Sequence, residues 1–408
     1  MRDSVIYPGV APLYATRFAC IGASCGDNCC ADGWIVTVDR ESYEGLRRVR
    51  VSGLTRRLRR ALRRLPAPTE DHRYARIVYE PGCTTCPLLA EGLCEIHARM
   101  GEGWLCDTCF HYPRRVLEFA GEYSQTLSLS CPEAARLAFG TADALEIVTA
   151  DVRARPSTMQ HARPVHGLTL DAMLRVHRFC LRLMRRRDLA LWQRLGVLGT
   201  LCEGLQGLFD AGRATDADAL IGAVAADVEG GGAVAALASA TPDLRRQALA
   251  FATLITEHPV PATSDVQRRV FSEVVRGLTG SEARQADADT VVAAYARGIG
   301  RLEDALRAVP HLLDHYVLNE MLAVGFPFER TAPMDAYRCL AGQFGTLRFL
   351  LAARCANDPF PDAEALVQTA CVFARRFAHD QRFAQAVGSP PPDHGWTSAR
   401  SICSIVRT

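Results

Sequence analysis

Ten of the sixteen cysteines lie between residues 20 and 131, and their spacing suits the binding of a metal. Four of them fall within eleven residues, and two later pairs have the CxxC spacing. Zinc and iron–sulfur clusters each take four thiolate ligands. The spacing therefore predicts a metal centre, and it leaves zinc and iron–sulfur both open. The ten residues are Cys20, Cys25, Cys29, Cys30, Cys83, Cys86, Cys94, Cys106, Cys109 and Cys131.

The expected cellular compartment supports the prediction of a metal centre. The first residues lack the basic and then apolar pattern of a secretory signal, and no run of about 18 apolar residues predicts a transmembrane helix. We therefore expect a cytoplasmic protein, where thiols stay reduced and a cysteine cluster holds a metal more often than disulfides. The formal net charge of +2 indicates no general attraction to nucleic acid, so no nucleic-acid partner is expected.

Short strands and loops must position these cysteines. We expect residues 1–19 to be irregular, because Pro8, Gly9 and Pro12 block regular structure. Strands are predicted at 34–38 and 74–79, and a β-hairpin at 116–129 turns at Ala120 and Gly121. Residues 46–65 carry leucines at helical spacing on one face and arginines on the other, which predicts an amphipathic helix. Its arginine face is either solvated or a docking surface for an acidic partner.

The chain changes character after Pro132. Residues 133 to about 388 have apolar positions at helical spacing and no convincing strand, so we expect roughly ten helices. The fold class is therefore mainly α: a small cysteine-rich α+β metal-binding module at 1–132, followed by an all-helical domain at 133–408. Single cysteines in the helical region behave as small buried hydrophobes. These are Cys180, Cys202, Cys339, Cys355, Cys371 and Cys403.

Several motifs resemble the flagellin lysine-N-methylase family, part of a wider group with a CxxCxxCC-type zinc- or iron-chelating domain. The N-terminal motifs are Phe18-Ala-Cys20-Ile-Gly-Ala-Ser-Cys25-Gly-Asp-Asn-Cys29-Cys30, Cys86-Pro-Leu-Leu with Gly92-Leu-Cys94, Cys109-Phe-His-Tyr-Pro113-Arg114, and Ser128-Leu-Ser-Cys131-Pro-Glu133. The helical region adds Leu312-Leu-Asp-His315-Tyr316-Val-Leu-Asn319 and Phe326-Pro327-Phe328.

The resemblance implies a methyltransferase that N-methylates surface lysines of flagellin, its protein substrate. It also implies S-adenosylmethionine as methyl donor and a cysteine-bound iron–sulfur cluster of the 4Fe-4S type, with zinc as the alternative. Cys83 and Cys106 fall outside the family pattern. The implied metal ligands are Cys20, Cys25, Cys29, Cys30, Cys86, Cys94, Cys109 and Cys131.

Catalytic and donor-binding residues are less well indicated. The chain has neither the GxGxxG loop of nucleotide-binding folds nor the CxxxCxxC signature of standard radical enzymes, so donor binding stays open. Asp27 could orient a substrate or simply shape the loop, and Arg114 could pair an anion or balance thiolate charge. Tyr123 could transfer a proton, although a hairpin tyrosine more often packs. In the helical region, we expect His315, Tyr316 and Asn319 to take part in a buried hydrogen-bond network.

Two hypotheses from different classes follow. The first is a cytoplasmic protein-lysine N-methyltransferase acting on flagellin. The alternative is a non-catalytic zinc or iron–sulfur binding or redox protein whose helical domain docks a protein partner. The sequence assigns no oligomeric state to either.

Overall fold

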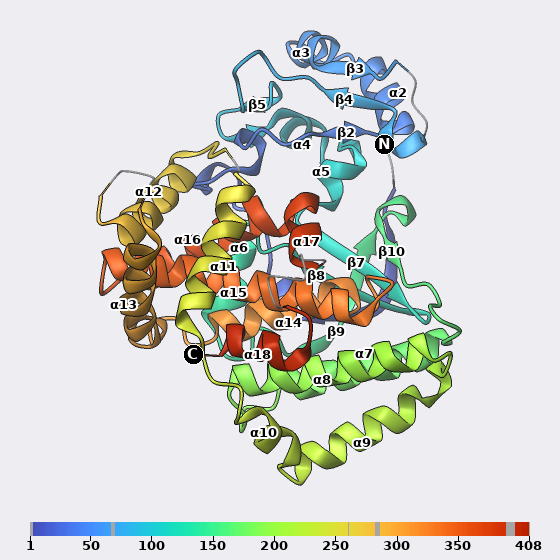
Figure 1. Ribbon diagram of the computed structural model, residues 1–408. Helices are drawn as coiled ribbons and strands as arrows, with labels where there is room; N and C mark the ends of the chain where they lie inside the picture. Colours follow the sequence, from blue (N-terminus) through green and yellow to red (C-terminus); the bar gives the residue numbers. More distant parts are fainter. Residues whose placement is uncertain (1–2, 67–69, 260, 282–285, 389–395, 408) are drawn as a thin grey trace.

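A computed structural model describes residues 3–66, 70–259, 261–281, 286–388 and 396–407. Helices dominate the fold, and a small α+β region from the N-terminal part lies above them in Figure 1. The mainly α class is therefore confirmed. The longer helices of the C-terminal region are α7 Leu170–Met184, α8 Leu191–Asp210, α9 Ala217–Glu229, α11 Leu244–Glu257, α12 Asp265–Thr279, α13 Ala288–Leu306, α14 Leu312–Val324, α15 Pro333–Asn357 and α16 Ala363–Phe373.

Shorter elements complete the helical region. A π-helical turn at Ala374–Ala378 follows α16 directly. The short helices are α6 Pro132–Gly140, α10 Gly232–Leu237, α17 Gln381–Gly388 and α18 Ala399–Val406.

Strand β1, Val5–Pro12, corrects the expectation that residues 1–19 are irregular. It lies inside a five-stranded sheet of order β10-β7-β8-β1-β9. Its pairing with β8 covers only Gly9 and Val10, so Pro8 and Pro12 lie outside that pairing. A Cβ at Gly9 would collide with the carbonyl oxygen of Tyr123, which explains the glycine at this close approach.

The expectation of no strand after residue 133 is also wrong. Strand β9, Ile147–Ala154, pairs antiparallel with β1 along its whole length, and β10, Gln160–His161, pairs with β7. Alternate side chains at the end of β9 are buried, with Val152 and Ala154 covered and Arg153 exposed. The alanines and Asp151 of this segment weaken its strand propensity, and tertiary pairing overrides that preference.

The predicted hairpin is confirmed as β7, Arg114–Phe119, and β8, Glu122–Leu127. The strands expected at 34–38 and 74–79 are present in shorter form, as β2 Thr37–Val38 and β4 Ala75–Ile77. They pair in a separate sheet of order β2-β4-β3.

The single helix predicted at 46–65 is wrong in its extent. Helix α2, Arg40–Arg48, ends where Val49 becomes extended, and Gly53 adopts a φ of +79° before α3, Leu54–Ala61, begins. The chain then enters strand β3, Leu62–Arg64, which pairs with β4. The amphipathic pattern survives within α3, where Leu54 and Leu58 are buried. Its arginines, including Arg56, Arg59 and Arg60, are exposed.

Two large hydrophobic clusters organise the chain, beside a small third one of Val116, Val152 and Ala154. One lies within residues 36–110 of the cysteine-rich region. The other extends from Ala11 to Val406, and it includes Leu117 and Leu127 of the hairpin. Thus β1, β7 and β8 pack with the helices, and the boundary at residue 132 stays a prediction.

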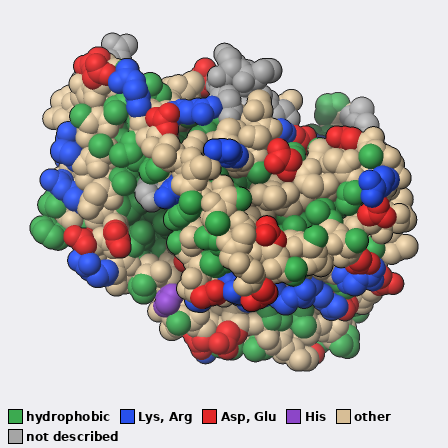
Figure 2. Space-filling model, turned by 60° about the horizontal axis from the view of Figure 1, so that its bottom comes forward, with side chains coloured by type: hydrophobic (Ala, Val, Ile, Leu, Met, Phe, Trp, Pro, Cys, Tyr) green, Lys and Arg blue, Asp and Glu red, His purple; other side chains and the backbone are tan. Residues whose placement is uncertain are grey.

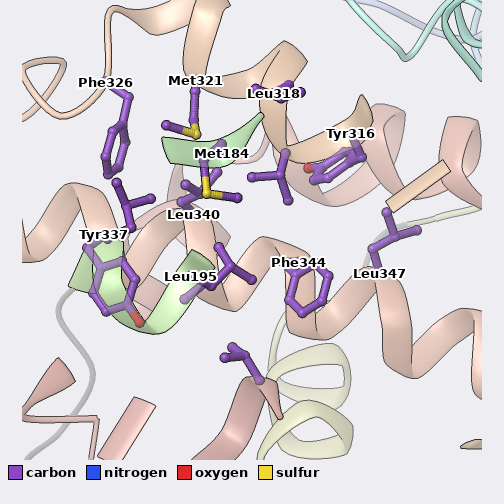
Figure 3. Close-up of a cluster of buried hydrophobic side chains, with 14 of the residues drawn as sticks. Met184, Leu195, Tyr316, Leu318, Met321, Phe326, Tyr337, Leu340, Phe344 and Leu347 are labelled. Atoms are coloured by element: carbon purple, nitrogen blue, oxygen red, sulfur yellow. The ribbon is translucent and has the colours of Figure 1, made fainter. Parts of the chain in front are cut away.

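Helix α15 forms the centre of the larger cluster. Its Tyr337, Leu340, Phe344 and Leu347 pack with side chains of α14 and of other helices (Figure 3). Glycines let neighbouring helices approach it, because a Cβ at Gly298 of α13 would collide with the backbone of Ala352. The six cysteines of the helical region are all buried, which confirms their predicted role in packing.

Charges of both signs are spread over the surface. On the face drawn in Figure 2, acidic and basic side chains alternate and no single sign prevails. Within the described ranges, no helix has both the length and the apolar character that a membrane span requires.

Candidate metal centre

The first cysteine loop is held against a second cysteine segment. The first loop contains two 3-10 turns, Gly22–Ser24 and Cys29–Ala31. The Asn28 side chain accepts a hydrogen bond from the Cys30 amide at 2.8 Å and donates to the carbonyl of Gly92 at 3.0 Å. The amide of Cys86 donates to the carbonyl of Cys30 at 2.7 Å. The last of these bonds brings Cys30 beside Cys86 although 55 intervening residues separate them in the sequence.

Cys29 and Cys30 form one coupled pair of thiols. A hydrogen bond between the two side chains lowers the pKa of Cys29 below its ordinary value, and the nearby Arg375 guanidinium contributes to that lowering. The same bond, together with burial, raises the pKa of Cys30. Cys94 and Cys86 lie close enough to raise the Cys30 pKa further. Cys29 is therefore the thiol of this pair that ionises more readily.

Cys106 and Cys109 form a second pair at the start of α5, Asp107–His111. Their mutual hydrogen bond lowers the pKa of the Cys106 thiol and raises that of Cys109. Cys109 also interacts electrostatically with Cys30 and Cys94. The family pattern omits Cys106, but the structure places it against Cys109 and buries it. Its CxxC spacing is the sequence signal for this proximity.

The remaining cysteines of this region are either at least partly buried or exposed to solvent. Burial raises the pKa of Cys86 to about 11 and that of Cys131 to about 12. Burial also raises the pKa of Cys25, and both Cys25 and Cys131 interact with Cys29. Cys20 and Cys83 are exposed.

The donor set suits a thiophilic metal, although the side chains do not form a finished site. Among the residues that the structure describes, no three Cys, His, Asp or Glu side chains converge on one ion position. Electrostatic coupling nevertheless links Cys29, Cys30, Cys86, Cys94, Cys106 and Cys109 in one neighbourhood. Thiolates are the ligands that zinc and iron–sulfur clusters prefer. The eight-cysteine ligand set stays a prediction.

Asp27 joins this loop to the helical region. Its Oδ2 accepts a hydrogen bond from Nη1 of Arg375 at 2.8 Å, and Arg375 also donates to the carbonyl of Ser130. Arg375 belongs to the π-helical turn after α16, and such turns are frequent at functional sites. The neighbouring Arg376 pairs with Asp32. Sequence reasoning missed Arg375, because one arginine among many carries no local signal.

The other two weak catalytic candidates have packing partners. Arg114 forms an ion pair with Glu102 at 3.0 Å and donates to the carbonyl of Phe110. Tyr123 stacks on Tyr7 with ring centroids 4.4 Å apart. These contacts give both side chains structural roles in the sheet region.

The expected polar network in α14 is confirmed. His315 Nδ1 lies 2.7 Å from the carbonyl oxygen of Ala138. The Tyr14 hydroxyl lies 2.6 Å from Oδ1 of Asn319, and Asn319 also donates to the carbonyl of Leu127. These bonds connect α14 with α6 and with the hairpin, so their role is structural.

A cavity of about 510 Å³ opens beside the first cysteine loop. The loop contributes Cys25, Gly26 and Asp27, and α6 and α16 supply much of the remaining wall. The cavity therefore lies next to thiols of the cluster.

Comparison with known proteins identifies the family. A family model described as the FliB lysine N-methylase C-terminal domain matches residues 177–404, more than half of the chain. The chain belongs to the FliB lysine N-methylase family. The match covers α8 to α16 and the π-helical turn that carries Arg375.

Individual relatives of the FliB lysine N-methylase family align over a shorter stretch. The lysine-N-methylase of Salmonella typhimurium is 28% identical over 137 residues, which is 33% of this chain and 33% of that protein. The flagellar biosynthetic protein FliU of Salmonella muenchen is 27% identical over 137 residues, or 79% of its length. The alignment thus spans about a third of the length of the lysine-N-methylase. No solved structure gives a significant match.

Proposed function

We propose that this protein is a protein-lysine N-methyltransferase that modifies flagellin. Membership of the FliB lysine N-methylase family is the observation that carries the proposal. The similarity of the chain to a lysine-N-methylase and to a flagellar biosynthetic protein supports the reaction and the flagellar substrate.

The proposal includes an iron–sulfur cluster, of the 4Fe-4S type, bound by the cysteine cluster, and S-adenosylmethionine as methyl donor. The residues that would hold the cluster are among Cys20, Cys25, Cys29, Cys30, Cys86, Cys94, Cys109 and Cys131, and Cys25 also lines the cavity. When bound, such a cluster supplies redox chemistry and, where one iron lacks a thiolate, a coordination position.

The protein's own residues prepare this site in two ways. Burial of Cys86 and Cys106 shields part of the thiol cluster from water. The Arg375 guanidinium favours the thiolate form of Cys29, as its effect on the pKa of that thiol indicates. Both effects suit a centre that binds metal through thiolates.

Co-expression with flagellin tests the proposal. The chain contains no lysine, so methyl-lysine detected by mass spectrometry of purified flagellin cannot come from the enzyme itself. We expect methyl-lysine with the wild type and with the matched control Cys83→Ser, whose thiol is exposed. We expect none with Cys29→Ser. Unmodified flagellin with all three proteins would contradict the proposal.

The alternative, a non-catalytic zinc or iron–sulfur protein that docks a partner, draws support from the exposed arginines of α3. Metal analysis separates it from the enzyme. Anaerobically purified enzyme should be brown and contain iron and sulfide. A closed zinc site with four cysteine ligands offers no open coordination position, so colourless zinc protein without methylation would favour the alternative.

A further inference from the structure

The cavity beside the first cysteine loop has the size and lining of a small-molecule site. Its volume of about 510 Å³ falls within the range of about 300–1,000 Å³ that is usual for such sites. Much of its wall is apolar, with Phe139, Val309, Val367 and Val372 among the contributing side chains. Cys25 also lines it, so a ligand in the cavity would lie next to the thiol cluster.

One residue of the lining, Asp27, has a buried polar atom without a partner among the described residues. Asp27 is 6% exposed, and its Oδ2 accepts the hydrogen bond from Arg375. Its Oδ1 is buried and has no hydrogen-bond partner within the part of the chain that the structure describes. A buried carboxylate oxygen without a donor is unfavourable, so a ligand that supplies an N–H group would be favoured there. A cationic ammonium group is the donor that best complements the carboxylate.

Other polar groups of the lining suit a ligand with several functional groups. Arg136 forms an ion pair with Glu133, yet its side chain is 65% exposed and can turn toward a ligand carboxylate. Gln368 contributes an amide. The lining therefore combines an acceptor for an ammonium group, a guanidinium for a carboxylate and apolar walls for a flat ring system.

We propose that this cavity binds the S-adenosyl methyl donor, with the ammonium group of its methionine end at Asp27 Oδ1 and its adenosine among the apolar side chains. The inference rests on the proposed function. A target lysine also carries an ammonium group, but its four methylenes would leave most of this volume and the Arg136 guanidinium unused. The adenosyl donor uses all three features.

Binding of two unreactive analogues to the full-length protein tests this placement by equilibrium dialysis. S-adenosylhomocysteine has the amino-acid end, and 5′-methylthioadenosine lacks it. Asp27→Asn should weaken binding of S-adenosylhomocysteine by roughly tenfold or more, the usual loss for a charge-assisted hydrogen bond. The same variant should change binding of 5′-methylthioadenosine by less than about twofold, since that ligand does not reach Asp27.

A second variant fills the cavity without touching the buried ion pair. Val367→Trp should weaken both analogues by at least about tenfold, because the indole occupies the ligand volume. The matched control is Ile147→Trp, at the separate apolar cavity of about 300 Å³ beside β9, and both analogues should bind it as they bind the wild type. If Val367→Trp lowers the melting temperature strongly, the test rests on Asp27→Asn, which should weaken S-adenosylhomocysteine binding much more than 5′-methylthioadenosine binding.

Several outcomes overturn the inference. These are absence of S-adenosylhomocysteine binding to the wild type, unchanged binding to a folded Val367→Trp protein, or equal weakening of both ligands by Asp27→Asn. Loss of flagellin binding by Val367→Trp with intact S-adenosylhomocysteine binding would assign the cavity to the target lysine instead. Failure of the proposed function is distinguishable, because flagellin would then stay unmethylated even where S-adenosylhomocysteine binds normally.

Discussion

Arg375 and Asp27 form a buried ion pair with a distance of 2.8 Å between Nη1 and Oδ2, although 348 positions separate them. The pair fastens the first cysteine loop to the π-helical turn after α16. Arg375 also donates to the carbonyl of Ser130, next to Cys131. One side chain from the end of the chain thus positions two cysteine segments from its beginning.

Arg375→Met should lower the free energy of unfolding by about 3–5 kcal/mol, because it leaves the Asp27 carboxylate buried and unpaired. The control is Arg382→Met, whose side chain is 76% exposed in its pair with Asp380 and should cost less than about 1 kcal/mol. Urea unfolding monitored by circular dichroism measures both. Equal losses of unfolding free energy in the two variants would show that the buried ion pair stabilises the protein no more than the exposed one.

Gly298→Ala should destabilise the protein, since the added Cβ would collide with the backbone of Ala352 and push α13 away from α15. We expect a loss of about 1–3 kcal/mol, which is typical of overpacking. Gly300→Ala lies on the same helix with open space around its Cβ, and it should stabilise the protein by up to about 1 kcal/mol. Thermal unfolding compares the two, and a stabilising Gly298→Ala would refute the close packing.

Cys106→Ser should reduce the metal content of anaerobically purified protein, because Cys106 is buried and hydrogen-bonded to Cys109 in the thiol cluster. Cys83→Ser should retain the wild-type content, since Cys83 is exposed. Iron and zinc per chain are measured by mass spectrometry of the metals. Wild-type metal content in Cys106→Ser would support the family pattern, which leaves this cysteine out.

Acid should weaken the fold partly through His177. Burial lowers the pKa of this side chain to about 4, while the unfolded chain binds the proton near its ordinary pKa of about 6.5. As the pH falls from about 6.5 to 4, the unfolded state takes up the proton first, and stability decreases by about 3 kcal/mol in total. Above pH 6.5 both states are neutral and the contribution disappears.

His177→Asn should therefore flatten the fall of unfolding free energy across this pH range, because asparagine does not titrate. His161→Asn is the control, since that side chain is 51% exposed. Carboxylates titrate alike in all three proteins, so the difference between the curves isolates the histidine. Parallel curves for His177→Asn and the wild type would contradict the buried neutral state.

Local sequence patterns predicted the secondary structure correctly where the contacts that stabilise an element lie within one segment. Helical spacing of apolar residues indicated the helices after residue 165, and the turn residues Ala120 and Gly121 indicated the hairpin. Burial of the single cysteines followed from the same patterns. The first cysteine loop was visible because its four thiols are close in the sequence itself.

Sequence alone therefore determined the predominance of helices, the hairpin, the cysteine-rich character of the first 131 residues and the family resemblance. Only the tertiary structure decided that Val5–Pro12 is a central strand, because its partners β8 and β9 come more than 100 residues later. It also decided that the Cys106–Cys109 pair lies near Cys30 and Cys94 and that Arg375 meets Asp27. Hydrogen bonds and ion pairs between distant segments depend on how the chain closes in space, and a periodicity within one segment carries no record of its distant partner.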